Sequence, residues 1–245
     1  IPKDTKSNPE TTLKVSKEFP EVKFEHITGY MRSSNMATGN IRFYEGRYVQ
    51  GVVAGLMTKS NKIGYVASFP IPEVIQGINA FALGMRSVNP NAEMSIIWVN
   101  SWYDPVKERA SAEALVEQGV DVIGQHVDSP TPNVVAQEKG ILGTGHHRDM
   151  SEFAGNSSVC SSVWVWDKYL TPALKTISSG SWKPSAWGDF LSIKAGGTDI
   201  VISDNVPKSV KEKVMAERQA LIDGKHVFAG PIKDQSGKVR VACPF

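Results

Sequence analysis

Aromatic and acidic side chains follow three apolar runs of this chain, at the points where strands would end. Phe69 ends the first run, Trp102 comes shortly after the second, and Asp128 comes shortly after the third. Aromatic faces stack on flat molecules, and a carboxylate accepts hydrogen bonds from N–H groups. These residue types favour a binding site for a flat small molecule with polar edges.

Each of these residues also has a structural explanation. Trp102 could be an exposed loop aromatic, and Asp128 or Ser129 could cap the helix expected to start at Pro132. Asp104 directly precedes Pro105, which is typical of a helix N-cap, so we expect Asp104 to be mainly structural.

Two further aromatic positions are candidates for the same site. Trp164 and Trp166 alternate along an expected strand, so they share one face and either belong to the core or offer a second stacking surface. Tyr30 follows the apolar segment 22–27 and could reach the ligand, although loop tyrosines do so less often than not.

The segment from Gly145 to Met150 places His146, His147 and Asp149 close together in an expected polar loop. Adjacent loop histidines rarely face one ion, and the sequence has no His-Glu-x-x-His helix. We therefore expect no metal site. The sequence also lacks a Gly-x-Ser-x-Gly elbow, a phosphate loop and a Cys-x-x-Cys pair, so we expect neither catalytic residues nor a cofactor.

Composition is that of an ordinary globular protein, with 245 residues, 41% hydrophobic and 21% charged. A net charge of +2 is too small to indicate a nucleic-acid partner. No apolar run approaches the length of about 18 residues that a membrane-spanning helix needs. Cys160 and Cys243 are two free thiols in the favoured interpretation, and one disulfide remains the alternative.

The segment 62–164 alternates between strands and helices, which predicts an α/β fold with a mainly parallel sheet covered on both faces. Strands are expected at 64–69, 94–99, 120–125, 141–143 and 162–166, and before residue 62 only at 22–27. Helices are expected over 42–57, from Pro72, Asp104 and Pro132, and over 168–178 and 206–224, with a hairpin around 234–237. The expected buried stripes are Ile75, Ile78, Ala82 and Met85 in one helix and Val106, Ala110, Ala114 and Leu115 in the next.

Several long motifs carry a family resemblance. They read IRFYEGRYVQGVVAG, KIGYVASFPIPEVIQGINAF, WVNSWYDP, DVIGQHVDSP, VWVWDKYL and GPIKDQSGKVRVA. In this order, from about Thr12 to Ala242, the chain resembles the basic membrane protein family of solute-binding proteins, which deliver purine nucleosides or bases to ABC importers.

The resemblance implies a type I periplasmic-binding fold with two lobes. Family members carry strand–helix units before the segment that matches Thr12, so the first lobe is expected to be incomplete. The expected division is a partial first lobe at 1–61 with a returning segment near 165–186, a second lobe at 62–164, and strands and a helix at 187–245 that complete the lobes.

The implied function is that of a non-catalytic solute-binding component. It would hold a purine base or nucleoside in the cleft between the lobes and deliver it to an ABC transporter permease in the periplasm or cell envelope. Membrane association is expected only through a lipid anchor outside this chain. The alternative is a ligand-sensing regulatory protein of the same fold.

The resemblance also assigns roles to individual residues. It places a stacking aromatic at Trp102. Nucleoside binders carry a sugar-reading acid at the position aligned with His147, and its absence here favours a free base. They carry a cation near Trp164, where this chain offers an indole as a second stacking surface. The expected ligand-binding residues are Trp102, Asp128, Phe69, Trp164, Tyr30 and His147.

Overall fold

The computed structural model describes residues 9–185, 189–229, 232–233 and 239–241. Its larger sheet has six strands in the order β4-β3-β5-β6-β7-β9. Strands β3 to β7 are parallel, and β9 pairs antiparallel with β7. Their bounds are β3 Lys62–Ala67, β4 Glu93–Trp98, β5 Val122–His126, β6 Leu142–His147, β7 Ser158–Trp164 and β9 Thr198–Ile202.

Side chains of the central strands point alternately to the two faces of this sheet and are apolar on both. Helices therefore cover both faces. Ile63 and Tyr65 of β3 pack with Phe81 on one face, whereas Val66 packs with Leu115 on the other. The first face carries α2 and α3, and the second carries α4 and α5. The bounds are α2 Phe43–Met57, α3 Pro72–Val88, α4 Pro105–Glu117 and α5 Thr131–Glu138, with the short helices α6 Ser151–Ala154 and η1 Gly155–Ser157 before β7.

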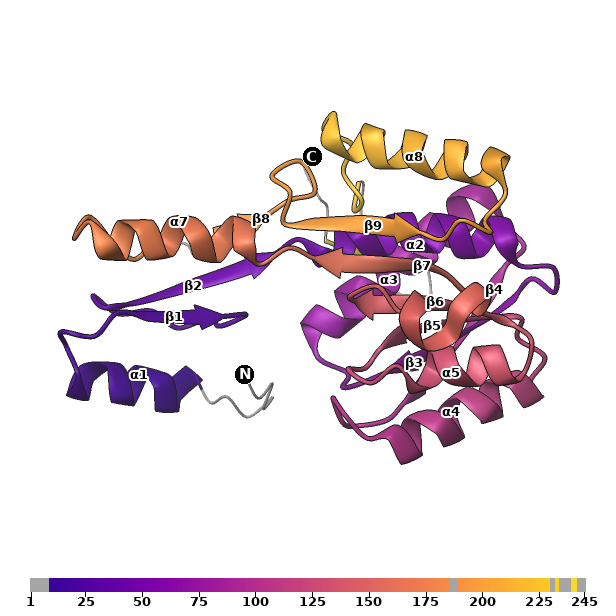
Figure 1. Ribbon diagram of the computed structural model, residues 1–245, viewed down its shortest axis with the longest axis horizontal. Helices are drawn as coiled ribbons and strands as arrows, with labels where there is room; N and C mark the ends of the chain where they lie inside the picture. Colours follow the sequence, from indigo (N-terminus) through magenta and orange to yellow (C-terminus); the bar gives the residue numbers. More distant parts are fainter. Residues whose placement is uncertain (1–8, 186–188, 230–231, 234–238, 242–245) are drawn as a thin grey trace.

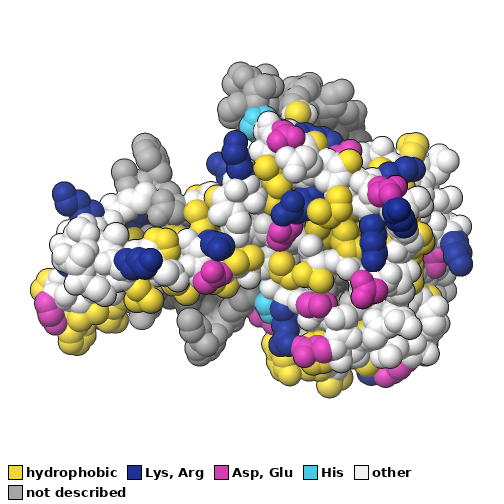
Figure 2. Space-filling model, turned by 45° about the horizontal axis from the view of Figure 1, so that its top comes forward, with side chains coloured by type: hydrophobic (Ala, Val, Ile, Leu, Met, Phe, Trp, Pro, Cys, Tyr) yellow, Lys and Arg dark blue, Asp and Glu magenta, His cyan; other side chains and the backbone are white. Residues whose placement is uncertain are grey.

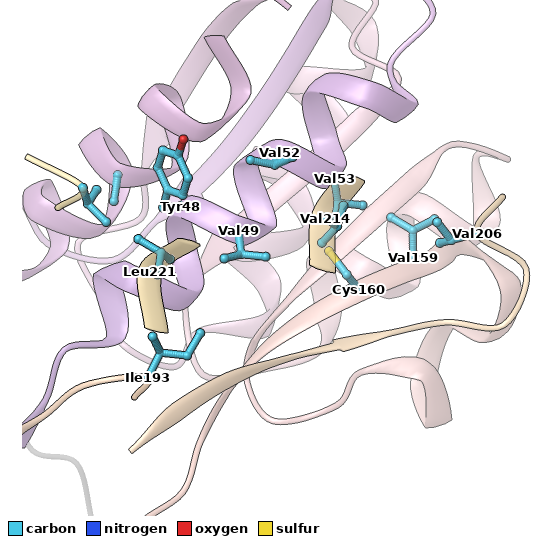
Figure 3. Packing of buried hydrophobic residues seen from close by; sticks show 12 residues of the cluster. Tyr48, Val49, Val52, Val53, Val159, Cys160, Ile193, Val206, Val214 and Leu221 are labelled. Atoms are coloured by element: carbon cyan, nitrogen blue, oxygen red, sulfur yellow. The ribbon is translucent and has the colours of Figure 1, made fainter. Parts of the chain in front are cut away.

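A further core lies between α2, β7 and helix α8 (Lys208–Ile222) (Figure 3). Val49 and Val53 of α2 meet Cys160 of β7 and Val214 of α8 there. Burial raises the pKa of the Cys160 thiol, and this cysteine is free. Cys243 lies outside the described residues. In the part of the chain that the structure describes, no helix is long and apolar enough to cross a membrane.

A smaller parallel sheet forms the other lobe, with strand order β1-β2-β8. Helices α1 and α7 lie on either side of it (Figure 1). A Cβ at Gly39 of β2 would overlap the ring of Tyr169 in α7, so glycine permits this close approach. The bounds are α1 Pro9–Glu18, β1 Phe24–Ile27, β2 Met36–Ile41, α7 Asp167–Ser178 and β8 Asp189–Leu191.

The chain crosses between the two sheets three times, from β2 to α2, from β7 to α7 and from β8 to β9. Hydrogen bonds join these crossings. The Arg42 N–H donates to the Leu191 carbonyl (2.8 Å), and the Val165 N–H donates to the Gly197 carbonyl (2.8 Å). The Ile193 N–H donates to the Glu45 carboxylate (2.6 Å). The sheets thus meet at a narrow, internally bonded region (Figure 1).

The α/β fold with two mainly parallel sheets confirms the prediction, and each predicted helix is present with shifted ends. The predicted C-terminal hairpin is also present, as β10 Ile232–Lys233 paired antiparallel with β11 Val239–Val241. Its turn at 234–237 lies outside the described residues. Helix α2 falls within the predicted first-lobe range 1–61, yet it packs on α3, β7, β9 and α8. The lobe boundaries themselves remain predictions.

Several details of the sequence prediction were wrong. Strands β2, β8 and β9 were missed, β6 continues to His147 where a loop was expected, and β7 begins at Ser158 rather than residue 162. In α3 the side chain of Ile75 is 40% exposed, while Val74 and Phe81 are fully buried. Ile78 and Met85 of the predicted stripe are buried as expected, so the error in α3 is confined to the start of the stripe.

Candidate ligand-binding site

The parallel strands of the larger sheet end at one edge, which faces the smaller sheet (Figure 1). Strands β1 and β2 of the smaller sheet point their own carboxyl ends toward the same region (Figure 1). In open α/β sheets, ligands bind outside the carboxyl ends of the strands. The predicted site residues of the larger sheet lie at this edge, just after β3, β4 and β5 or at the ends of β6 and β7.

Aromatic rings form a continuous cluster along this edge. Phe69 and Trp102 have ring centroids 5.6 Å apart, and Trp102 lies 5.9 Å from His126. His126 continues to His146 at 4.4 Å, and His146 meets the Trp164 ring edge-on at 5.1 Å. Trp102 is half-buried, and its Nε1 has no hydrogen-bond partner among the described residues. The cluster offers apolar ring faces with polar atoms at their edges.

Three titratable side chains gather beside these rings. Ligand-type atoms of Asp128, His146 and His147 all lie within 4.8 Å of one another. The Asp128 Oδ1 is 3.7 Å from the His146 Nε2. His147 ends β6 with φ of 54°, a left-handed conformation that is uncommon outside glycine. This bend turns the chain directly at the candidate site.

The loops that carry Trp102 and Asp128 are tied together at the start of α4. The Asp128 N–H donates to the Trp102 carbonyl at 2.7 Å. Buried Glu108 accepts from the Asp104 N–H at 2.9 Å and from the Ser129 hydroxyl. Burial raises the pKa of Glu108 above its ordinary value. This bonding fixes the spacing between the aromatic ring and the acid.

Asp104 caps α4, as the sequence indicated. Its carboxylate accepts from the Lys107 N–H at 3.1 Å, and this hydrogen bond holds the pKa of Asp104 below its ordinary value. At the start of α5, the Ser129 hydroxyl accepts from the Thr131 N–H at 3.2 Å, which agrees with the capping explanation of this segment.

A buried arginine lies behind the site, and the sequence analysis missed it. Arg47 of α2 is fully buried, and its guanidinium donates to the Gln50 Oε1 (2.8 Å), to the Gly145 carbonyl (3.5 Å) and to the His146 Nδ1. Gln50 donates to the same carbonyl at 2.6 Å. Burial lowers the pKa of Arg47. The sequence signal that could have revealed Arg47 is a charged residue within a largely apolar helix.

The structure brings together five of the six predicted site residues, namely Phe69, Trp102, Asp128, His147 and Trp164. Tyr30 belongs to the smaller lobe, where it follows β1 and is 72% exposed. A groove of about 680 Å³ lies next to the cluster at the crossings and shares Phe43 with it. Phe43 touches the rings of His126 and Trp164, at 5.7 and 5.6 Å.

These features describe a two-sheet α/β protein with a cluster of aromatic and acidic side chains at the strand ends. Residues 7–236 match the family of ABC transporter substrate-binding, PnrA-like proteins. A purine-binding protein of Brucella abortus is 46% identical over 230 residues, covering 92% of this chain and 64% of the relative. A putative ABC transporter glucose-binding protein of Haloferax volcanii, TsgA13, is 41% identical over 222 residues, covering 88% of this chain and 55% of the relative.

A solved ABC transporter solute-binding protein of Aeropyrum pernix has the same fold, with a TM-score of 0.75 at 18% identity, over 88% of this chain and 73% of that one. The chain belongs to the PnrA-like family of ABC transporter substrate-binding proteins. This confirms the family resemblance, the type I periplasmic-binding fold and a binding rather than catalytic protein class. The chain spans 64% and 55% of the length of the two curated relatives.

Proposed function

We propose that this chain is the ligand-binding part of a substrate-binding protein that delivers a purine to an ABC importer. The observation that carries the proposal is the pairing of Trp102 with Asp128 after β4 and β5, the two strands that flank β3, where a 2.7 Å backbone hydrogen bond joins them. The relationship to a purine-binding protein at 46% identity supports the same ligand class.

In this proposal the ligand ring stacks on Trp102, and Phe69 or Trp164 adds a second apolar surface. Asp128 accepts hydrogen bonds from the N–H groups of the ring edge. Tyr30 and the end of β1 contribute from the smaller lobe when the two lobes close around the ligand, which is the usual hinge motion of two-lobed binding proteins.

The proposed ligand is a free base rather than a nucleoside. His147 stands where a sugar-reading acid is expected, so the ribose hydroxyls lose their strongest acceptor. A neutral imidazole accepts one hydrogen bond at most, whereas a carboxylate accepts several. Adenine or guanine should therefore bind at least as tightly as its nucleoside.

Calorimetry with purified protein tests both statements. Adenine, guanine, adenosine, guanosine and glucose are titrated separately, with glucose included because of the name of the Haloferax volcanii relative. Saturable binding of a purine without binding of glucose supports the proposal. A clear preference for nucleosides would overturn the base assignment alone, and binding of glucose without any purine would overturn the ligand class.

We propose that the partner is the membrane permease of an ABC importer and that the protein works outside the cytoplasm, as is typical of its family. Charged side chains of both signs are interspersed on the face shown in Figure 2. Such a mixed surface gives no reason to expect nucleic acid as a partner. The test is the ATPase rate of a reconstituted permease, which should rise only with the ligand-loaded protein.

A further inference from the structure

Arg47 has an unusual environment for a cation. It is fully buried in α2, and among the described residues no carboxylate lies within ion-pair distance of its guanidinium. Its guanidinium donates to the Gln50 amide oxygen, the Gly145 carbonyl and the His146 Nδ1. Burying a charge without an opposite charge beside it lowers the stability of the fold. A buried arginine of this kind therefore suggests a specific role.

The contact with His146 determines where the imidazole proton sits. A guanidinium carries only N–H donors and has no acceptor atom. The His146 Nδ1 that faces it must therefore offer a lone pair, and a doubly protonated ring would place two donors against each other. The remaining ring proton belongs on Nε2, which is 3.7 Å from the Asp128 Oδ1.

We propose that Arg47 and His146 are positioning residues for the ligand-reading acid: Arg47 holds His146 as the neutral Nε2–H tautomer, and the positive end of this N–H attracts the Asp128 carboxylate, whose Oδ1 is 3.7 Å from Nε2. This inference rests on the proposed function, because it gives Asp128 the role of reading the ring edge. Asp128 then presents acceptor atoms only, so the ligand edge that meets it must carry N–H donors.

The same residues, Asp128, His146 and His147, have the spacing of a metal site. A metal on the His146 Nε2 would require the lone pair at that atom and the proton at Nδ1. That proton would point at the N–H groups of the Arg47 guanidinium, so two donors would face each other. The positive charge of the guanidinium would also lie close to that of the metal ion. The geometry thus favours an organic ligand with N–H donors over a cation.

Nuclear magnetic resonance of histidine ring nitrogens tests the tautomer directly in the intact protein, without ligand. Long-range proton–nitrogen correlations of ¹⁵N-histidine-labelled protein should assign the His146 proton to Nε2, with the His146→Gln variant used for assignment. Replacement of Arg47 by methionine should mix the two tautomers and weaken guanine or adenine binding roughly tenfold. Arg47→Lys keeps a donor-only cation and should restore both the single tautomer and most of the affinity.

Arg218→Met is the control for the loss of an arginine, because Arg218 pairs with Asp199 at 2.6 Å rather than with His146. It should leave the His146 tautomer and purine affinity unchanged. A wild-type proton on Nδ1, an Arg47→Met variant with unchanged tautomer and affinity, or stoichiometric Zn²⁺ binding that shifts His146 and His147 would each overturn the inference. If the His146 proton is found on Nε2 but the protein binds no purine, the Arg47–His146 part of the inference stands and the proposed function is wrong.

Discussion

Trp102 has a packing role beside its proposed binding role, which affects how its replacement must be interpreted. Its ring touches Phe69 and His126, and it packs at the margin of the core between β3 and α3. The ring is nevertheless only half-buried, at the sheet edge where ligands bind. Part of its surface therefore remains for stacking.

Replacing Trp102 with alanine should weaken purine binding by about ten- to a hundredfold, since aromatic stacking contributes about 1–3 kcal/mol per base. Because the ring also packs against its neighbours, the free energy of unfolding should fall by roughly 1–3 kcal/mol. Calorimetry and thermal melting measure the two effects. The control is Tyr103→Ala, whose side chain is 65% exposed and whose loss should change neither quantity. Unchanged affinity in Trp102→Ala, with only the stability lost, would make Trp102 a core residue.

Three of the residues predicted for this site, Phe69, Trp102 and Asp128, share one signal, because each ends or follows an apolar run. Trp102 and Asp128 were found because parallel strands bring their carboxyl ends to one edge. Arg47 and His146 gave no such signal, since their pairing joins a helix to a strand 99 residues later in the chain. Periodicity identifies a buried face, but the contacts made within it depend on how the elements pack.

At the scale of elements, helix α4 shows why a periodic pattern can give the wrong face. Its predicted stripe began at Val106, which is 80% exposed, whereas Glu108 is fully buried. Glu108 faces inward because it accepts from Asp104 and Ser129. A charged residue on the inner face is invisible to a hydrophobic pattern.

Strand β2 was missed for a related reason. Its sequence, MATGNI, contains Gly and Asn, which are depleted in strands. The strand is nonetheless mostly buried, between β1 and β8. By contrast, the apolar strands of the larger sheet were predicted well, because strands buried on both faces read as continuous apolar runs.

The junction between α2 and β3 depends on the Asp121 carboxylate. This group accepts from the Thr58 hydroxyl (2.6 Å), the Lys59 N–H (2.6 Å) and the Ser60 N–H (2.7 Å). Burial raises the pKa of Asp121, but these three donors outweigh it and hold the pKa below its ordinary value. A lowered pKa stabilises the fold above the ordinary pKa of an aspartate, and that contribution is lost as the pH falls through the folded-state value.

Asp121→Asn should therefore destabilise the protein by about 1 kcal/mol at pH 7, a figure kept small because solvent screens part of the interaction. The difference from wild type should shrink below about pH 4, where the wild-type carboxylate is protonated as well. Urea denaturation at several pH values measures this. Asp204→Asn is the control, since Asp204 is fully exposed and should show no such difference. If the stability difference between Asp121→Asn and wild type stays constant with pH, the effect comes from the changed shape of the side chain rather than from its lost charge.

At the scale of the whole molecule, the three crossings define where the lobes would hinge. Glu45 joins the first crossing to the third through the Ile193 N–H, and burial raises the pKa of this carboxyl group. Arg42 bonds the same pair of crossings through the Leu191 carbonyl. These two hydrogen bonds join the first crossing to the third, so we expect the two segments to move together in a hinge motion of the kind usual for two-lobed binding proteins.

The two lobes differ in how well their strands are protected, which leads to the last prediction. Strand β5 is buried along its whole length and lies between β3 and β6, whereas every residue of β1 is only half-buried. Among the described residues, β1 pairs with β2 alone. Backbone amides with few buried contacts around them open at lower free energy than those of a central strand.

Hydrogen exchange followed by mass spectrometry should show peptides of β1 and α1 exchanging at least tenfold faster than peptides of β3 and β5. Adding a purine that binds between the lobes should slow exchange in the loops after β1, β4 and β5 more than in α8, which packs on α2 away from the strand ends. Peptides of α8 are thus the internal control. Equal protection of β1 and β5 would mean that the smaller sheet is as firmly held as the larger one. Protection by ligand confined to the larger lobe would mean that Tyr30 and the smaller lobe take no part in binding.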